Sequence, residues 1–151
     1  MSALQNVLSR MTGTPLIFDG AMGTMIYEKG VFIQTCYDEL CLTEPGLILG
    51  IHEQYAQAGA QVLETNSFGA NRIKLRAYGL AEKVADINRA AARLARQAAG
   101  TTLYVAGSVG PCTQGGQVIT GRDMAEVEAA FREQVKALTE EGVDLLLLET
   151  F

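Results

Sequence analysis

Four short apolar segments divide the chain, at residues 16–19, 61–65, 103–107 and 143–150. Within each segment the apolar residues follow one another instead of alternating with polar ones. Continuous apolar runs of this length are typical of strands that are buried on both faces of a parallel sheet. The pattern therefore predicts four parallel strands.

Helical patterns with recognisable ends lie between these segments. The expected start and stop residues of three longer helices are, in chain order, Thr43 and Gly59, Ala81 and Gly100, and Asp123 and Gly142. Pro45 lies in the first turn of the first helix, and Glu126 follows Asp123 at the spacing of a capping box. A shorter helix is expected over residues 73–78. Alternating strands and helices predict an α/β fold, either a closed (β/α)8 barrel or an open doubly wound sheet, and periodicity does not choose between them.

Acidic side chains follow three of the four predicted strands: Asp19, Glu64 and Glu149. In both architectures the carboxyl ends of the strands meet at the ligand-binding edge of the sheet. Three converging carboxylates repel one another unless a cation, a metal or an ammonium group lies among them. The α-amino group of an amino acid is an obvious ligand, and the backbone N–H groups of the loop after Asp19 are suited to receive its carboxylate.

A structural explanation stays open for each acid. A strand-end carboxylate can cap the next helix, or it can pair with an arginine such as Arg72 or Arg122. The glycine-containing loop 20–24 can equally be a plain turn between strand and helix.

Composition narrows the class of protein. The chain has 151 residues, of which 48% are hydrophobic, and this is enough apolar material for a folded core. Its formal net charge of −5, without a basic cluster, argues against binding to nucleic acid. No apolar run approaches the length of a membrane helix, and residues 1–11 lack the layout of a secretory signal. Three cysteines do not suggest a disulfide framework, so we expect a cytoplasmic protein that meets neither membrane nor nucleic acid.

Several familiar motifs are incomplete. His52 begins a pattern like that of a zinc-binding helix, but the second histidine is absent, so we expect this single histidine on the helix surface. Cys36 and Cys41 are five residues apart and could lie near each other, but without a second pair or a histidine cluster they do not suggest a structural zinc site. Cys112, which follows the third predicted strand, is interpreted as a buried thiol. The loop after Asp19 loosely resembles that of haloacid dehalogenases, which would make Asp19 a nucleophile. The second acid of that loop is missing, because Ala21 occupies its place.

The strand-end motifs together resemble one family. They read FDGAMGT at residues 18–24, LETNSF at 63–68, GSVGP at 107–111 and LETF at 148–151, and the stretches 38–40, 51–60 and 70–75 also fit. In this collinear order they are similar to the N-terminal half of the homocysteine S-methyltransferase family. The resemblance is greatest to the homocysteine-binding module of cobalamin-dependent methionine synthases and of bacterial fusions with methylenetetrahydrofolate reductase.

The resemblance implies a (β/α)8 TIM barrel, of which residues 1–151 form the N-terminal portion with about the first four strand–helix units. It implies methyl transfer to the thiol of homocysteine to give methionine. The substrate-binding positions that it carries over are Asp19, Gly20, Ala21, Glu64, Thr65 and Glu149.

The chain departs from the family pattern in one respect. The family's zinc ligands are cysteines near the sixth and eighth strands, and this chain has none of them. We therefore expect zinc to bind only in the parent protein, this chain alone to be inactive, and the second half of the barrel to be its partner. The methyl source stays open, with methylcobalamin, a methyltetrahydrofolate relay, S-methylmethionine and betaine as alternatives. The other alternative is a non-catalytic half-barrel that pairs with a second copy or serves as a binding module.

Overall fold

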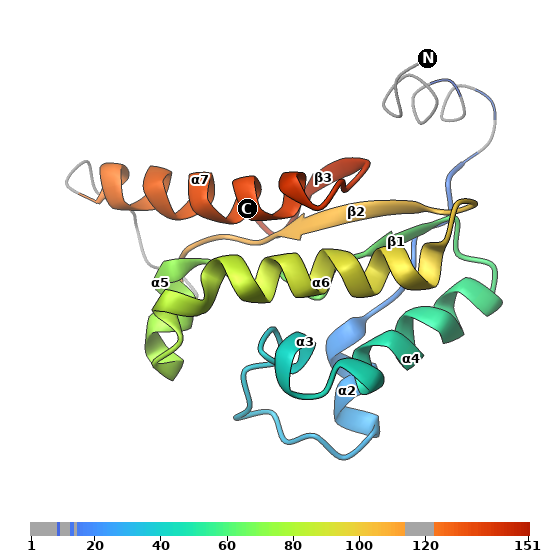
Figure 1. Cartoon of the computed structure of the whole chain (residues 1–151), viewed down its shortest axis with the longest axis horizontal. Helices are drawn as coiled ribbons and strands as arrows, with labels where there is room; N and C mark the ends of the chain where they lie inside the picture. Colours follow the sequence, from blue (N-terminus) through green and yellow to red (C-terminus); the bar gives the residue numbers. More distant parts are fainter. Residues whose placement is uncertain (1–8, 10–12, 14, 114–122) are drawn as a thin grey trace.

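The computed structural model describes residues 9, 13, 15–113 and 123–151. Within them a parallel sheet is ordered β1–β2–β3, shown in Figure 1, with β1 at Val62–Glu64, β2 at Tyr104–Val109 and β3 at Leu145–Leu148. Three of the four predicted strands are thus confirmed. The remaining predicted strand, the first in the sequence at residues 16–19, forms only a single parallel bridge, between Phe18 and Val62 at the edge of β1.

The order of the strands bears on the choice between the two architectures. Each strand pairs with the next one in the sequence, and Glu64 lies opposite Ala106 while Ala106 lies opposite Leu145. Right-handed crossovers between strands in this order place successive helices on the same face of the sheet. A doubly wound sheet instead reverses its strand order at a switch point. The described sheet has no reversal and is arranged like a sector of a barrel.

Three longer helices connect and cover the strands: α4 at Pro45–Gln57, α6 at Val84–Ala99 and α7 at Met124–Glu140. Helix α6 packs against both α4 and α7, and Figure 1 shows it running along the sheet. The predicted glycines follow these helices. Gly59, Gly100 and Gly142 all have positive φ, at 102°, 56° and 75°, which glycine adopts without steric cost. None of the described helices is long and apolar enough to cross a membrane.

One predicted helix start and one predicted capping box need correction. The N-cap of α4 is Glu44, because Thr43 is the last residue of a preceding short helix, α3 at Leu40–Thr43. Asp123 does occupy the N-cap of α7, but its side chain makes no capping hydrogen bond to the helix, so the capping box is not formed.

The remaining described elements are short. They are α2 at Met22–Glu28, α5 at Arg72–Leu75, and the 3-10 turns η1 at Arg76–Tyr78 and η2 at Ala81–Lys83. The predicted short helix over 73–78 corresponds to α5 and η1. The predicted start at Ala81 is the turn η2, and α6 itself begins at Val84. Asn71 caps α5 by accepting a hydrogen bond from the backbone N–H of Lys74 at 3.0 Å.

The hydrophobic core lies between the sheet and α6. Leu63 of β1 and Val105 of β2 are fully buried and cluster with Ala95 and Ala99 of α6. Because side chains alternate along a strand, Glu64 lies on the opposite face of the sheet from Leu63. The same alternation separates Ser108 from Val105. The polar residues at the strand ends therefore face away from the helix layer.

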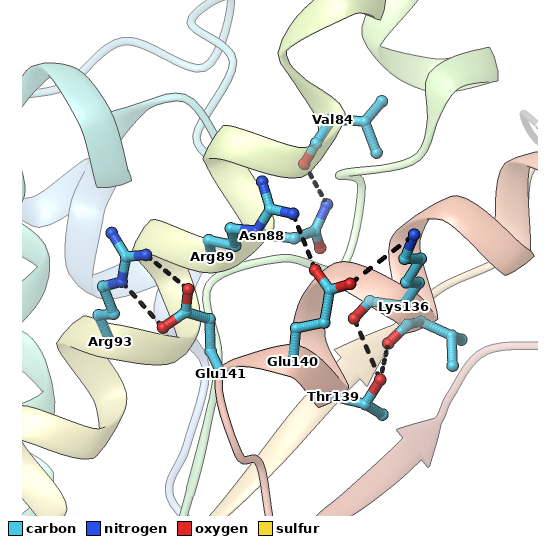
Figure 2. Close-up of polar contacts among 9 residues, drawn as sticks. Val84, Asn88, Arg89, Arg93, Lys136, Thr139, Glu140 and Glu141 are labelled. Carbon is cyan, nitrogen blue, oxygen red and sulfur yellow. Dashed lines mark hydrogen bonds and ion pairs between the residues drawn. The ribbon is translucent and has the colours of Figure 1, made fainter.

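Ion pairs join α6 to the end of α7. Arg89 contacts Glu140 at 2.8 Å and Arg93 contacts Glu141 at 2.5 Å, as shown in Figure 2. Exposed pairs such as these contribute little to stability, because water and salt screen the two charges. They align the two helices just before the chain enters β3.

The expectation for His52 was wrong. This residue is fully buried within α4, and neither ring nitrogen has a hydrogen-bond partner among the described residues. Burial lowers the pKa of His52 to about 4, so the ring is neutral at pH 7. Its position explains the error, because His52 follows Ile48 by four residues and therefore shares the buried face of the helix.

Candidate functional site

A cavity of about 600 Å³ lies at the carboxyl ends of the strands. The structure brings all the substrate-binding positions predicted from the sequence to its wall: Asp19, Gly20, Ala21, Glu64, Thr65 and Glu149. These residues come from the ends of β1 and β3, from the end of the segment 16–19 that bridges to β1, and from the loop that follows Asp19. Parallel strands collect their carboxyl ends at one edge, and this is why residues far apart in the sequence meet here.

Asp19 and Glu64 are linked directly. Both carboxylate oxygens of Asp19 accept a hydrogen bond from the backbone N–H of Glu64, at 3.1 and 3.0 Å. The pKa of Asp19 is nevertheless raised to about 7. Burial is the largest cause, and the negative charge of Glu149 adds to it. The backbone hydrogen bonds that lower its pKa do not offset the cost of placing this carboxylate away from water.

Glu64 experiences the same environment. Its pKa is raised to about 7, first by burial and then by the charges of Asp19 and Glu149. The three carboxyl groups therefore lie close enough to act on one another. Among the described residues, no ion pair includes any of the three. A cationic ligand would relieve the repulsion among these acids.

The structural alternatives for these acids find no support among the described residues. Arg72 pairs with Glu133 at 2.8 Å and with Glu82 at 2.6 Å. Arg122 lies outside the described residues. Helix α2, which follows Asp19, has Ala21 as its N-cap and no side-chain capping hydrogen bond.

The loop after Asp19 packs closely against α4. The hydroxyl of Tyr55 donates a hydrogen bond to the carbonyl oxygen of Ala21 at 3.3 Å. A Cβ atom added at Gly20 would lie 2.9 Å from that same hydroxyl oxygen. Gly20 is therefore required for close approach, and its backbone remains the expected partner for a ligand carboxylate.

Several polar residues of the cavity wall were not predicted as site residues, among them Ser108 and Asp38. The hydroxyl of Ser108 donates to Oε1 of Glu149 at 2.5 Å. The only sequence signal for Ser108 was its place at the end of a strand, because a serine there carries no charge that demands a partner.

Asp38 reaches the cavity from a loop. Its Oδ1 accepts a hydrogen bond from the backbone N–H of Gly69 at 2.9 Å, and burial raises its pKa to about 6. A Cβ atom at Gly69 would lie 2.7 Å from Oδ2 of Asp38, so this approach requires a glycine. Among the described residues no strand ends directly before Asp38, so its position in the sequence gave no reason to place it beside the strand ends.

The described residues do not fit a zinc site. No group of three histidine, cysteine or acidic side chains among them is arranged to hold a metal ion. Cys36, Cys41 and Cys112 are all buried free thiols. Burial raises the pKa of Cys36 to about 11 and that of Cys41 to about 12, so neither is a thiolate near neutral pH.

Comparison with known proteins identifies relatives of this arrangement. Residues 16–151 match the family model described as homocysteine S-methyltransferase. The metallated form of the homocysteine methyltransferase MmuM from Escherichia coli superposes with a TM-score of 0.80 at 29% sequence identity, over 98% of this chain and 57% of that one. Its oxidised form gives a TM-score of 0.80 at 28% identity, over 97% and 56%. The chain thus spans about half the length of these relatives.

Proposed function

Because the chain belongs to the homocysteine S-methyltransferase family, we propose that its parent protein transfers a methyl group to the thiol of homocysteine, giving methionine. The match confirms the family that the strand-end motifs indicated. The observation that supports the proposal is the convergence of Asp19, Glu64 and Glu149 on one cavity. Homocysteine carries an ammonium group, which is the cation that three carboxylates favour.

In this proposal the chain holds the amino-acid end of the substrate. The ammonium group lies among Asp19, Glu64 and Glu149, and the substrate carboxylate meets the backbone of Gly20 and Ala21. Thr65 lies beside them in the cavity wall. The thiol of homocysteine then points away from the acids, toward the part of the site that this chain does not supply.

The catalytic step belongs to the complete parent protein. We propose that the parent forms a closed (β/α)8 barrel, of which this chain supplies about four units, and that the other half is its partner. Zinc would bind there and activate the substrate thiol. The described cysteines do not fit that role, so this chain alone is expected to be inactive. The methyl donor, whether a cobalamin, a methyltetrahydrofolate relay, S-methylmethionine or betaine, is likewise chosen outside this chain. The free thiols of Cys36, Cys41 and Cys112 favour a reducing, cytoplasmic location.

One observation favours a second candidate, a non-catalytic half-barrel that pairs with another copy or binds a partner. Strand β3 is the last in the described sheet, and Leu148 is 66% exposed on it. An open edge with apolar side chains is a template for pairing with another strand. Sedimentation distinguishes the candidates, because a stable monomer at micromolar concentration argues against pairing between copies.

Calorimetry tests the proposed ligand. We would titrate the chain with L-homocysteine and, as a matched control, with 4-mercaptobutanoate, which has the same thiol and carboxylate but no ammonium group. The expected result is binding of homocysteine and at least about tenfold weaker binding of the control, since a charged hydrogen bond contributes about 1.5–3 kcal/mol. Equal affinity for both compounds would contradict the ammonium site.

A further inference from the structure

All the polar groups of Ser108 are engaged within the protein. Its backbone N–H donates to Oγ1 of Thr65 at 2.9 Å, and its carbonyl oxygen accepts from the hydroxyl of Ser67 at 2.8 Å. Its own hydroxyl donates to Oε1 of Glu149 at 2.5 Å. Ser108 is only 2% exposed, so water does not compete for these groups. The residue is therefore fixed from three sides.

The direction of each hydrogen bond follows from the number of hydrogens. Ser67 has one hydroxyl hydrogen, and it is donated to the carbonyl oxygen of Ser108. In the 2.6 Å contact between the two hydroxyls, Thr65 must then be the donor and Ser67 the acceptor. Thr65 has thereby used its only hydroxyl hydrogen inside the protein. Its side chain is part of the support of the site and is no donor for a ligand.

The hydroxyl groups of Thr65 and Ser67 bond to the backbone of Ser108 beyond the point where the backbone pairing of β1 and β2 ends. The register of β1 and β2 ends at Glu64 opposite Ala106, followed by one hydrogen bond from the N–H of Thr65 to the oxygen of Ala106 at 2.9 Å. Beyond that point the side chains of Thr65 and Ser67 satisfy the backbone of Ser108. Gln134 of α7, which is fully buried, donates to the carbonyl oxygen of Ser67 at 2.7 Å and anchors the cluster from the helix layer.

Among the residues that the structure describes, Glu149 is the charged group that this cluster contacts, and it lies in the cavity wall. We propose that Ser108 is a positioning residue for Glu149. Thr65 and Ser67 fix the backbone of Ser108, and the Ser108 hydroxyl holds one carboxylate oxygen of Glu149 and leaves the second for the ammonium group of the substrate. The identity of the ligand rests on the proposed function. The coupling between Ser108 and Glu149 does not depend on it.

A double-mutant cycle tests this role in the full chain. Ser108→Ala should weaken binding of L-homocysteine about tenfold, which corresponds to about 1.4 kcal/mol. The same variant should bind 4-mercaptobutanoate as the wild type does, because that compound has no ammonium group for Glu149. In a Glu149→Ala background, Ser108→Ala should cause no further loss, since residues that act through one another are not additive. Thr139→Ala, which removes an exposed hydroxyl from α7, is the control and should leave both affinities unchanged.

Urea denaturation makes the test independent of the ligand. If Ser108 acts on Glu149, the double variant lowers the urea midpoint by less than the sum of the decreases that the two single variants cause. If the wild type does not bind homocysteine, the proposed function is contradicted. The double-mutant cycle measured in urea then tests the inference about Ser108 by itself. Additive midpoints, or an equal loss of affinity for both compounds in Ser108→Ala, would overturn it.

Discussion

The two carboxylate oxygens of Asp19 share a single donor, the backbone N–H of Glu64. This contact ties the end of the first strand-like segment to the end of β1. It also places the carboxyl groups of both residues in one buried region, where each raises the cost of ionising the other. The arrangement is unfavourable without a ligand and becomes favourable when a cation is bound, so it joins the electrostatics of the fold to the proposed function.

Binding of homocysteine should depend on pH. Asp19 and Glu64 both have a pKa raised to about 7, by burial first and by neighbouring acids second. Below pH 7 they take up protons and lose the charge that attracts ammonium. We expect affinity to fall by up to roughly tenfold per pH unit for each proton taken up between pH 7 and pH 5. Calorimetry at several pH values measures this, and a flat profile over that range would exclude these acids as the ammonium site.

The substitution Asp19→Asn should separate stability from binding. A raised pKa of an acid means that the folded state holds a proton that the unfolded state releases. The stability contributed by this group is therefore complete below about pH 4 and is lost as the pH rises through about 7. The amide has no charge to bury and can still accept from Glu64. At pH 8 we expect a higher Tm than in the wild type and at least about tenfold weaker binding of homocysteine. A lower Tm would show that the charge of Asp19 stabilises the fold.

Replacing Glu149 with Gln in the complete parent protein should weaken the binding of homocysteine and not that of zinc. The substitution keeps the size of the side chain and removes its charge. Homocysteine affinity should fall about tenfold or more, because a hydrogen bond to a charged group is lost, while zinc affinity should change little. Glu128→Gln is the matched control, since Glu128 pairs on the surface of α7 with Arg132. Unchanged homocysteine affinity by calorimetry would rule out the role assigned to Glu149.

The sequence predicted the arrangement of the strands better than their lengths. Apolar runs located β1, β2 and β3, although only β1 and β2 are largely buried, as the pattern predicted, while the residues of β3 are half-buried or exposed. The sequence overestimated the strand character of the segment 16–19, since Ile17 is 59% exposed and only Phe18 forms a bridge. An apolar run indicates burial and does not show whether a neighbouring strand is present to pair with it.

The acids that end apolar segments could be predicted from the sequence, whereas Asp38 could not. Asp19 and Glu64 were visible because an acid at the end of an apolar strand needs a partner. Asp38 contacts Gly69, 31 residues later in the sequence, and only the folded chain shows that approach. His52 was misplaced because a polar residue type was weighed above its helical position beside Ile48.

Gly110 should tolerate no larger residue. A Cβ atom there would lie 2.4 Å from the ring of Phe68, which forms part of the cavity wall. Gly110→Ala must displace that ring, and we expect a loss of about 1–3 kcal/mol in the free energy of unfolding together with weaker binding of homocysteine. Gly50→Ala in α4 is the control, because nothing lies within 4 Å of its added Cβ. It should stabilise the helix by about 1 kcal/mol. Equal effects of the two substitutions on stability would contradict the close packing of Phe68.

The buried His52 should make the fold sensitive to acid. Its pKa is about 4 in the folded chain against an ordinary value of 6.5, so the unfolded state takes up a proton first as the pH falls. The stability that depends on the neutral ring is complete above pH 6.5 and is lost progressively down to pH 4. A difference of 2.5 pKa units corresponds to about 3 kcal/mol.

His52→Leu removes the titrating group and the two unpartnered nitrogen atoms while keeping an apolar side chain of comparable size. We expect urea denaturation to show a gain in the free energy of unfolding at pH 5 that exceeds any gain at pH 8, where the ring is neutral in both folded and unfolded states. The comparison of one variant at two pH values is its own control for packing, since a change in shape affects both conditions alike. An equal change at pH 5 and pH 8 would mean that a partner in the complete parent protein, or a water molecule, satisfies the ring in the folded state and keeps its pKa near the ordinary value.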